Sequence, residues 1–485
     1  MQQAQPVRAE NAAEAKFRRM TTQPVEKLIL KLAVPTIISM LVTALYNLAD
    51  TFFVRQLNSD SMVAAVGVVM PLMNIIQAIG FYHGQGSGNY LSRAFGRREL
   101  DDAEKMAATG FFLALSFGLV LAAVGLTLRG TFVQILGAKT PETAECSIRY
   151  MTWILLASPL MMGSIVLNNQ LRFQGNAFFS MIGLTSGAVL NVFLDPMLIF
   201  GPGDPIGLFG LKAAFGAGLG ISGAALATAI SQGVSFTVLA FGFSRSDNVK
   251  IRLRNFCPTT KYLKGILQGG LPSLARQGIA SVATASLNHA IGLYAGSAVL
   301  IDAAQAAMTG VNRITMVLAS ILIGFGQGFQ PVCGFNYGAR LYDRVREAFF
   351  FCVKVASAVL TVLAVLGFLF AGPVTNLVAG TSREASEIAI FAFRAHLVTL
   401  PLQAWIVLCN MMLQNIGATG KATLMAILRQ GLTFIPTVLL LPLLTGALGA
   451  SRLLGIQLAQ PASDVISFLI AIPVGGSELK KMKEL

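Results

Sequence analysis

Long apolar runs alternate with short polar stretches along nearly the whole chain. Each run approaches or exceeds the roughly 20 residues that a helix needs to cross a bilayer. Twelve such runs predict twelve transmembrane helices, over residues 28–54, 60–83, 104–128, 146–170, 177–200, 221–243, 265–293, 302–326, 347–371, 385–410, 422–446 and 455–474. We therefore expect an all-α membrane protein.

This pattern returns about half-way along the chain. A Gly-Gln-Gly run at 84–86 occurs again at 326–328, 242 residues later. The same offset holds without a gap from Gly84 to Gly175 and pairs Arg98 with Arg340, Asp101 with Asp343, Pro159 with Pro401, and Asn168 with Asn410. Because each half holds an even number of helices, the two repeats run parallel. We predict two six-helix, pseudo-symmetric bundles.

The charged residues set the predicted orientation and boundaries. Lys and Arg gather in both tails and in alternate loops, such as 245–264. This positive-inside pattern predicts a multi-pass protein of the plasma (inner) membrane with both termini in the cytoplasm. The predicted parts are an N-terminal tail at 1–24, a first lobe (helices 1–6) at 25–243, a basic linker at 244–264, a second lobe (helices 7–12) at 265–474 and a C-terminal tail at 475–485.

Composition narrows the class of protein further. Charged residues make up 12% of the chain, about half their share in soluble domains. The net charge of +14 arises mostly in short loops rather than in a basic domain, so we expect no binding to nucleic acid. The sequence contains no Walker A pattern, no metal-ligand spacing among its five cysteines and three histidines, and no nucleophile–base pair. It therefore favours a transporter driven by an ion gradient, without a cofactor, over an enzyme.

Two acidic residues fall inside predicted membrane helices, where an ionisable side chain is costly and marks a functional hypothesis. Asp50 completes a polar stripe with Tyr46 and Asn47 on the first helix. Asp195 follows Asn191 by one turn on the fifth helix, so both point the same way. The second half lacks such a pair, which predicts a coupling ion in the first half and alternating access shared by both halves.

These acids have two interpretations. Each could be a structural hydrogen-bond partner near a helix end. Alternatively, they converge with Asn168 and Thr228 of the same half, and their oxygens could hold Na⁺ at Asp50, Asn191, Asp195 and Thr228. Two carboxylates close together in a dry bundle are not expected to stay ionised without a cation, so they could carry H⁺ instead. The sequence leaves H⁺ and Na⁺ open.

Several motifs resemble those of multidrug and toxic compound extrusion (MATE) transporters, in particular the DinF-like and MepA-like branch. They are Tyr-Asn-Leu-Ala-Asp-Thr-Phe-Phe-Val at 46–54, the glycine-rich run at 84–96, Asn-x-x-x-Asp-Pro at 191–196 and Gln-Pro-x-x-Gly-x-Asn-Tyr-Gly-Ala at 330–339. The resemblance implies cation-coupled antiport of small amphipathic, often cationic, drugs. It places the coupling acids at Asp50 and Asp195, supported by Tyr46, Tyr150, Asn168, Asn191 and Thr228. The segment 201–220 is longer than this pattern.

The substrate cavity is less defined by the sequence. Its candidates are Asn47, Met161, Met162, Trp405, Asn410 and Met411, because methionine adapts its shape to varied ligands. Trp405 could instead anchor its helix. Asp302 and Asp464 lie closer to predicted helix ends, and Arg276, Arg313, Arg394 and Arg429 are expected to meet helix dipoles, backbone carbonyls or lipid headgroups. These arginines keep open an alternative, a flippase for lipid-linked oligosaccharides of related architecture. We expect a monomer in the lipid bilayer.

Overall fold

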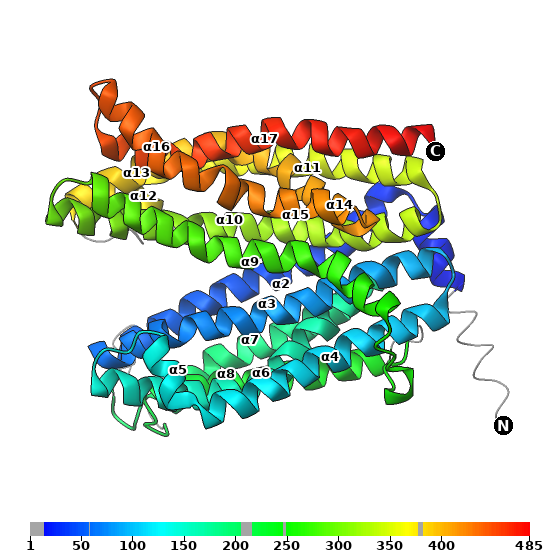
Figure 1. Cartoon of the computed structure of the whole chain (residues 1–485), viewed down its shortest axis with the longest axis horizontal. Helices are drawn as coiled ribbons and strands as arrows, with labels where there is room; N and C mark the ends of the chain where they lie inside the picture. The colour runs from blue at the N-terminus through cyan, green and yellow to red at the C-terminus, as the bar shows by residue number, and fades with distance from the viewer. Residues whose placement is uncertain (1–13, 58, 205–215, 246–248, 377–381) are drawn as a thin grey trace. The chain divides into compact units, whose positions relative to one another are not determined.

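The computed structural model describes residues 14–57, 59–204, 216–245, 249–376 and 382–485, and within them the chain is helical apart from short connections (Figure 1). The first half contains α2 (Val25–Arg55), α3 (Asp60–Gly96), α4 (Leu100–Thr127), α5 (Arg129–Ile135), α6 (Pro141–Phe173), α7 (Ala177–Ile199) and α8 (Ile221–Ser244). The second half contains η1 (Leu253–Asn255), α9 (Thr260–Tyr294), α10 (Ala298–Gly338), α11 (Tyr342–Leu369), α12 (Ala371–Asn376), α13 (Arg383–Thr399), η2 (Leu400–Leu402), α14 (Gln403–Ile416), α15 (Thr419–Ile427), η3 (Leu428–Leu432), α16 (Phe434–Ala447) and α17 (Arg452–Glu484). The all-α prediction is confirmed.

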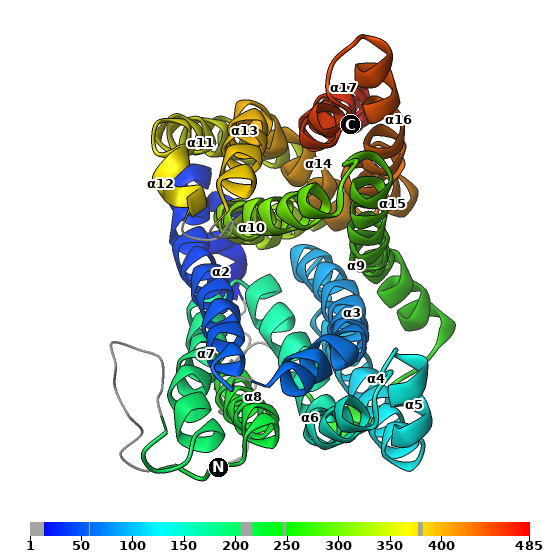
Figure 2. The ribbon, with the colours of Figure 1, turned by 90° about the vertical axis from the view of Figure 1, so that its left-hand side faces the viewer.

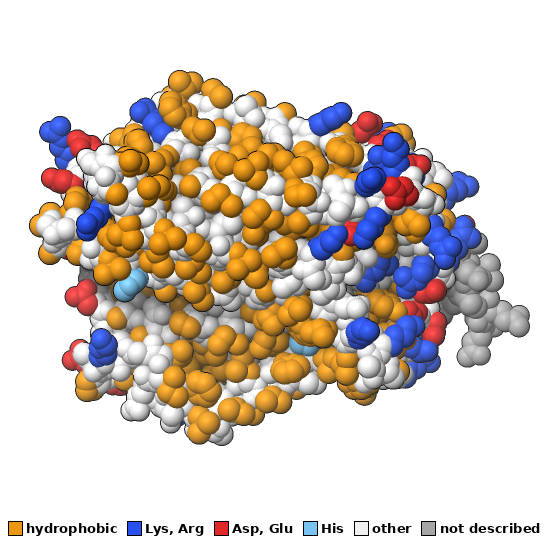
Figure 3. Space-filling view, turned by 45° about the horizontal axis from the view of Figure 1, so that its top comes forward, with side chains coloured by type: hydrophobic (Ala, Val, Ile, Leu, Met, Phe, Trp, Pro, Cys, Tyr) orange, Lys and Arg blue, Asp and Glu red, His pale blue; other side chains and the backbone are white. Residues whose placement is uncertain are grey.

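The lengths and compositions of these helices are those of an integral membrane protein. Among the described residues, eleven helical segments are long and apolar enough to cross a bilayer. The more polar α9, which carries Gln268, Arg276 and Asn288, stands where the seventh span is predicted. Apolar side chains cover much of the surface that Figure 3 shows.

Several helices are longer than the apolar pattern predicts, and α3 shows why. The helix predicted to end at residue 83 continues through the glycine-rich run to Gly96. Its glycines serve close packing instead of ending the helix. A Cβ at Gly86 would lie 2.3 Å from the carbonyl oxygen of Ile266, and one at Gly88 would lie 2.1 Å from the ring of Phe173.

Two of the predicted spans are interrupted inside the second half. The tenth consists of α13 and α14 joined by the 3₁₀ turn η2, which contains Pro401, a residue without a backbone N–H. The eleventh consists of α15 and α16 joined by η3, a single π-helical turn. Such turns add a residue to a helix and often mark functional sites.

Local backbone features recur at the predicted offset and confirm the repeat. Arg98 and Arg340, 242 positions apart, have φ angles of 62° and 60°, and they are the two non-glycine residues with positive φ in the described part of the chain. That backbone conformation is uncommon for a side chain of this size. Thr140 and Ser382 have the same separation, and each caps a helix by accepting a backbone N–H at 3.2 Å.

The helices form two compact units, each described here by itself. Unit 1 contains Ile38–Gly270 and the described residues up to Arg19, and unit 2 contains Met20–Ile37 and Leu271–Leu485. The divisions lie within α2, close to Pro35, and within α9, close to Pro272. The boundaries of these units differ from those of the predicted lobes at 25–243 and 265–474. The lobes stay a prediction about which parts of the chain move during transport.

One long helix is central to the packing of each unit (Figure 2). In unit 1, α6 packs against α3, α4 and α8, and α7 lies along α8. In unit 2, α10 packs against α11, α13 and α14, and α16 lies along α17. Each unit therefore surrounds its own polar side chains with apolar helix faces.

Candidate functional site

Three side chains of unit 1, those of Asp50, Asn191 and Asp195, each have one buried oxygen without a hydrogen-bond partner. Asp195 on α7 is fully buried, and its Oδ1 accepts a hydrogen bond from Nδ2 of Asn191 at 3.3 Å. The other oxygen of Asp195, Oδ1 of Asn191 and Oδ1 of Asp50 on α2 are buried without a donor. Because leaving a buried acceptor unpaired costs free energy, this arrangement calls for a proton or a cation.

Four of the predicted site residues interact electrostatically. Asp50 acts on Asp195, and both acids act on the phenol groups of Tyr46 and Tyr150. Tyr150 on α6 is buried, and its hydroxyl donates a weak hydrogen bond to Sδ of Met73 at 3.8 Å. These side chains come from α2, α6 and α7, and their role in ion coupling stays a prediction.

A small polar cavity adjoins these acids. It measures about 20 Å³, and its lining includes Tyr46, Asn191, Thr228, Ser231 and Ser235. A cavity of this size holds one water molecule or one small ion. The hydroxyl of Thr228 donates to the carbonyl of Ala224 at 3.1 Å, so its lone pairs remain available to a cation. Asp195 does not line the cavity and adjoins it through Asn191.

Asn168 lies apart from this cavity. Its amide nitrogen donates to the carbonyl oxygen of Ser180 at 3.2 Å and to the hydroxyl of Ser180 at 2.9 Å, which ties α6 to the start of α7. Asn410 makes the equivalent bond in the second half, to the carbonyl of Ala422 at 2.7 Å. Since the second half lacks the acid pair, this repeated contact favours a structural role for Asn168.

The predicted substrate residues do not form one cluster in either unit. Met161 and Met162 are buried in unit 1, whereas Asn47 is exposed. The remaining three are in unit 2, where Asn410 and Met411 are buried and Trp405 packs edge-on against Phe349, with ring centroids 5.2 Å apart. Trp405 Nε1 is buried without a hydrogen-bond partner. Whether Trp405 contacts substrate or anchors its helix stays a prediction.

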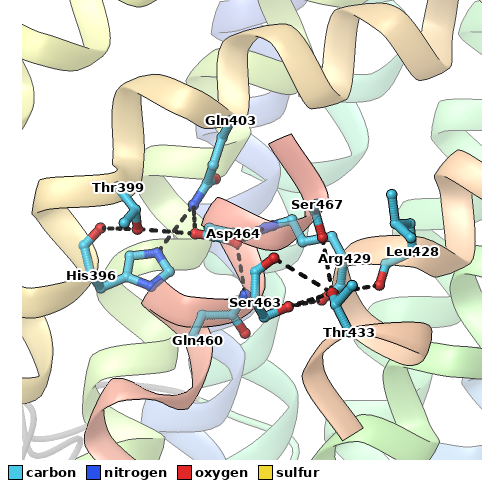
Figure 4. A network of polar contacts seen from close by, with 10 residues as sticks. All are labelled: His396, Thr399, Gln403, Leu428, Arg429, Thr433, Gln460, Ser463, Asp464 and Ser467. Atoms are coloured by element: carbon cyan, nitrogen blue, oxygen red, sulfur yellow. Dashed lines mark hydrogen bonds and ion pairs between the residues drawn. The ribbon is translucent and has the colours of Figure 1, made fainter. Parts of the chain in front are cut away.

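Unit 2 contains a charged network that the sequence analysis missed (Figure 4). Asp464 is fully buried in the interior of α17, so its predicted place near a helix end is wrong. Arg429 does not rely on helix dipoles or lipid headgroups, because its Nε lies 2.6 Å from Oδ1 of Asp464. Gln403 connects the pair to His396 by bonding Asp464 Oδ2 at 2.9 Å and His396 Nε2 at 3.3 Å.

The described residues place no group of three or more His, Cys, Asp or Glu side chains where it could hold a metal ion. The oxygens of unit 1 are instead carboxylate, amide and hydroxyl groups, which suit a hard cation.

The MatE family model matches the chain twice, over residues 35–197 and 278–440, which together make up more than half of its length. The chain belongs to the MatE family. The protein is therefore a transporter and not an enzyme, and the family suggested by the motifs is confirmed. Because the model matches once in each half, it also agrees with the internal repeat.

Curated relatives of this MatE-family chain share its full architecture. Multidrug export protein MepA of Staphylococcus aureus (strain MSSA476) is 26% identical over 462 residues, which cover 94% of this chain and 97% of MepA. Multidrug export protein MepA of Staphylococcus haemolyticus is 26% identical over 428 residues, which cover 87% and 88% of the two chains. Both alignments cover most of the chain.

Solved structures of MatE-family proteins have the same fold. One described as an outward-facing conformation of a multidrug resistance MATE family transporter superposes with a TM-score of 0.85 at 26% identity, covering 96% of this chain and 98% of that one. A transporter from Pyrococcus furiosus, described as having a binding pocket of reverse polarity that suggests a different function, superposes with a TM-score of 0.83 at 26% identity. That comparison covers 96% of this chain and 99% of the other.

A weak signal for the missed network was present in the sequence of this MatE-family protein. Gln460 and Asp464 are one turn apart, and Gln460 Nε2 donates to Asp464 Oδ1 at 2.9 Å. The same spacing drew attention to Asn191 and Asp195. The partners Arg429 and Gln403 belong to other helices, and no local pattern links them to Asp464.

Proposed function

We propose that this protein is a secondary active multidrug efflux transporter, which exports amphipathic, cationic compounds in antiport with H⁺ or Na⁺. The observation that carries the proposal is the set of three unpartnered buried oxygens on Asp50, Asn191 and Asp195. The names of the MepA relatives, which are multidrug export proteins, support export of varied drugs.

The two ions would use the site differently. Protonation requires only the carboxylates of Asp50 and Asp195, which repel each other when both are ionised. Sodium also requires neutral oxygens, which Asn191 and Thr228 beside the cavity would supply. We propose that H⁺ can drive efflux and that Na⁺, where it acts, depends on these neutral ligands.

Transport would follow alternating access. The drug would bind an inward-facing state, and rocking of the two bundles would then expose it to the outside. Binding of the cation at Asp50 and Asp195 favours release of the drug, and the protein returns with the ion. Coupling requires that drug and ion prefer different states, because a ligand shifts an equilibrium only by its differential affinity.

The protein would act as a monomer in the plasma (inner) membrane, with both termini in the cytoplasm. Support comes from the Lys and Arg residues of both tails and of alternate loops. Positively charged ends of membrane proteins stay on the cytoplasmic side.

The test is transport by purified protein in liposomes, with H⁺ and Na⁺ gradients imposed separately. We expect ethidium export to follow the pH gradient and to slow when that gradient is dissipated while the Na⁺ gradient is held. Unchanged export under that treatment would assign coupling to sodium alone. Asp302→Asn is the matched control, since Asp302 is an exposed acid near the start of α10.

The alternative is a flippase for lipid-linked oligosaccharides, which needs cationic groups for anionic phosphates. Arg429 is neutralised by Asp464 at 2.6 Å, and Arg394 lies over the ring of Phe368 at 5.1 Å. These pairings disfavour a phosphate site, and the same liposomes, loaded with a labelled lipid-linked oligosaccharide, would test for flipping.

A further inference from the structure

The carboxylate of Asp464 is fully supplied with donors by its own unit. Oδ1 accepts from Arg429 Nε at 2.6 Å and from Gln460 Nε2 at 2.9 Å. Oδ2 accepts from Gln403 Nε2 at 2.9 Å and from the hydroxyl of Thr399 at 3.3 Å. A carboxylate with a guanidinium and three further donors is stable in its charged form, even when fully buried.

At the repeat offset of 242 residues, Arg429 is compared with a cavity residue of the first half. It lies 242 residues after Gly187, which lines the small polar cavity. Both positions face the last helix of their half. A Cβ at Gly187 would lie 2.8 Å from Cβ of Ser235 on α8, and the carbonyl of Arg429 accepts a hydrogen bond from Ser463 on α17 at 2.7 Å.

The backbone around Arg429 is also fixed by hydrogen bonds. It lies in the π-helical turn η3, where Thr433, 242 residues after Asn191, donates to the carbonyl of Leu428 at 2.8 Å. The hydroxyl of Thr433 also bonds those of Ser463 at 2.7 Å and Ser467 at 2.9 Å (Figure 4). In the described residues, no buried oxygen of this network lacks a partner, whereas Asp50, Asn191 and Asp195 of the first half each have one that does.

We propose that Arg429 is a tethered counterpart of the coupling ion. Its guanidinium neutralises Asp464 as a mobile cation would neutralise the acids of the first half, so Asp464 stays charged and this half exchanges no ion during transport. Behind the arginine lies a latent site for a monovalent cation, H⁺ or Na⁺, made by Asp464 with Gln403, Gln460 and Thr399. The inference rests on the proposed function, since it compares this site with the coupling site of the first half.

The experiment first removes the coupling site of the first half and then removes Arg429, so that a cation can reach Asp464. In purified Asp50→Asn/Asp195→Asn protein, thermal unfolding is measured with NaCl against choline chloride of equal ionic strength, and between pH about 8 and about 5. We expect little response to Na⁺ or pH in that background. Adding Arg429→Ala should make the midpoint rise by about 5 °C or more with Na⁺ or with acid, because a ligand that binds only the folded state stabilises it.

The matched control adds Asp464→Asn to Arg429→Ala in the same background, which removes both charges and should abolish the response. A folded Arg429→Ala variant that ignores both Na⁺ and pH would overturn the inference. So would a background protein that already responds and loses its response through Asp464→Asn, since the native site would then exchange ions.

A variant that does not fold still tests the inference. If Arg429→Ala yields no folded protein, ethylguanidinium should restore it by refilling the vacated place, and uncharged ethylurea at equal concentration should not. Rescue by neither compound contradicts the inference. Failure of the proposed function has a separate readout, because ion-driven ethidium export by the Asp50→Asn/Asp195→Asn protein would overturn that proposal without using the unfolding data.

Discussion

Asp195 and Asp464 are both fully buried acids inside membrane helices, yet their surroundings differ. Asp464 has an arginine at 2.6 Å and donors at both oxygens. Asp195 has one amide donor at 3.3 Å and an unpartnered oxygen. The protein itself supplies every partner of Asp464. Asp195 requires a proton or a cation from outside the protein, and coupled transport needs such an exchangeable ion.

Neutralising either first-half acid should remove coupling without unfolding the protein. Asp50→Asn and Asp195→Asn keep the side-chain volume but cannot bind a proton or supply a full charge. Each should lower the initial rate of ethidium efflux from cells by about tenfold or more, because drug release loses its driving interaction. The measurement is fluorescence of preloaded cells at matched expression, and parental efflux by either variant would show that the acid does not carry coupling.

A substitution at Asn191 can distinguish transport driven by Na⁺ from transport driven by H⁺. Its unpartnered Oδ1 and its place in the cavity lining suit a sodium ligand, whereas protonation of the acids does not need it. Asn191→Ala should therefore weaken transport driven by Na⁺ more than transport driven by H⁺, by several-fold in liposomes with one gradient at a time. An equal loss under both gradients would indicate that Asn191 positions Asp195 rather than binding the ion.

Sequence patterns identified the candidate site residues that are paired with another polar residue on the same helix. Asp50 with Tyr46, and Asp195 with Asn191, are visible because one turn separates the members of each pair. Arg429 and Asp464 are 35 positions apart on different helices, and their pairing depends on how η3 meets α17. No spacing along the chain carries that information, so the network could be found only in the folded protein.

At the scale of the element, close packing decides where helices end and where glycine is required. The apolar pattern placed the centres of the spans correctly, but it missed α3 beyond residue 83 and the breaks at η2 and η3. Those features depend on partners in other helices. Gly86 and Gly328, 242 residues apart, pack against the backbones of Ile266 and Ala33, respectively.

Alanine at either glycine should destabilise its unit. An added Cβ would lie 2.3 Å from the Ile266 carbonyl at position 86 and 2.5 Å from Cα of Ala33 at position 328. Since both neighbours are backbone, Gly86→Ala and Gly328→Ala should each cost about 1–3 kcal/mol, seen as a lower thermal unfolding midpoint in detergent. Gly278 in α9 has open space around it, so Gly278→Ala should be neutral or stabilising by up to about 1 kcal/mol. Equal midpoints for all three variants would refute the packing argument.

At the scale of the whole molecule, the charge pattern predicts which loops face the cytoplasm. Single cysteines at Arg254 and at Ala450, both exposed, are introduced into protein whose five native cysteines have been replaced. In intact cells an impermeant thiol reagent should label Ala450→Cys and spare Arg254→Cys, and cell lysis should expose the latter. The reverse labelling would show that every helix has the orientation opposite to the one predicted here.

The division of α2 and α9 between the units has a consequence for biosynthesis. Residues 20–37 are made before almost everything else, yet they belong to unit 2, and Thr36 bonds the carbonyl of Gly324, 288 residues further on. Unit 1 likewise includes α9 up to Gly270, which is translated only after the last helix of the first half. Unit 1 is therefore incomplete when the ribosome finishes the first half, and residues 20–37 lack their unit 2 partners until the second half is made. We expect the first half to stay incompletely folded in the membrane until α9 is made, and both units to finish folding late in translation.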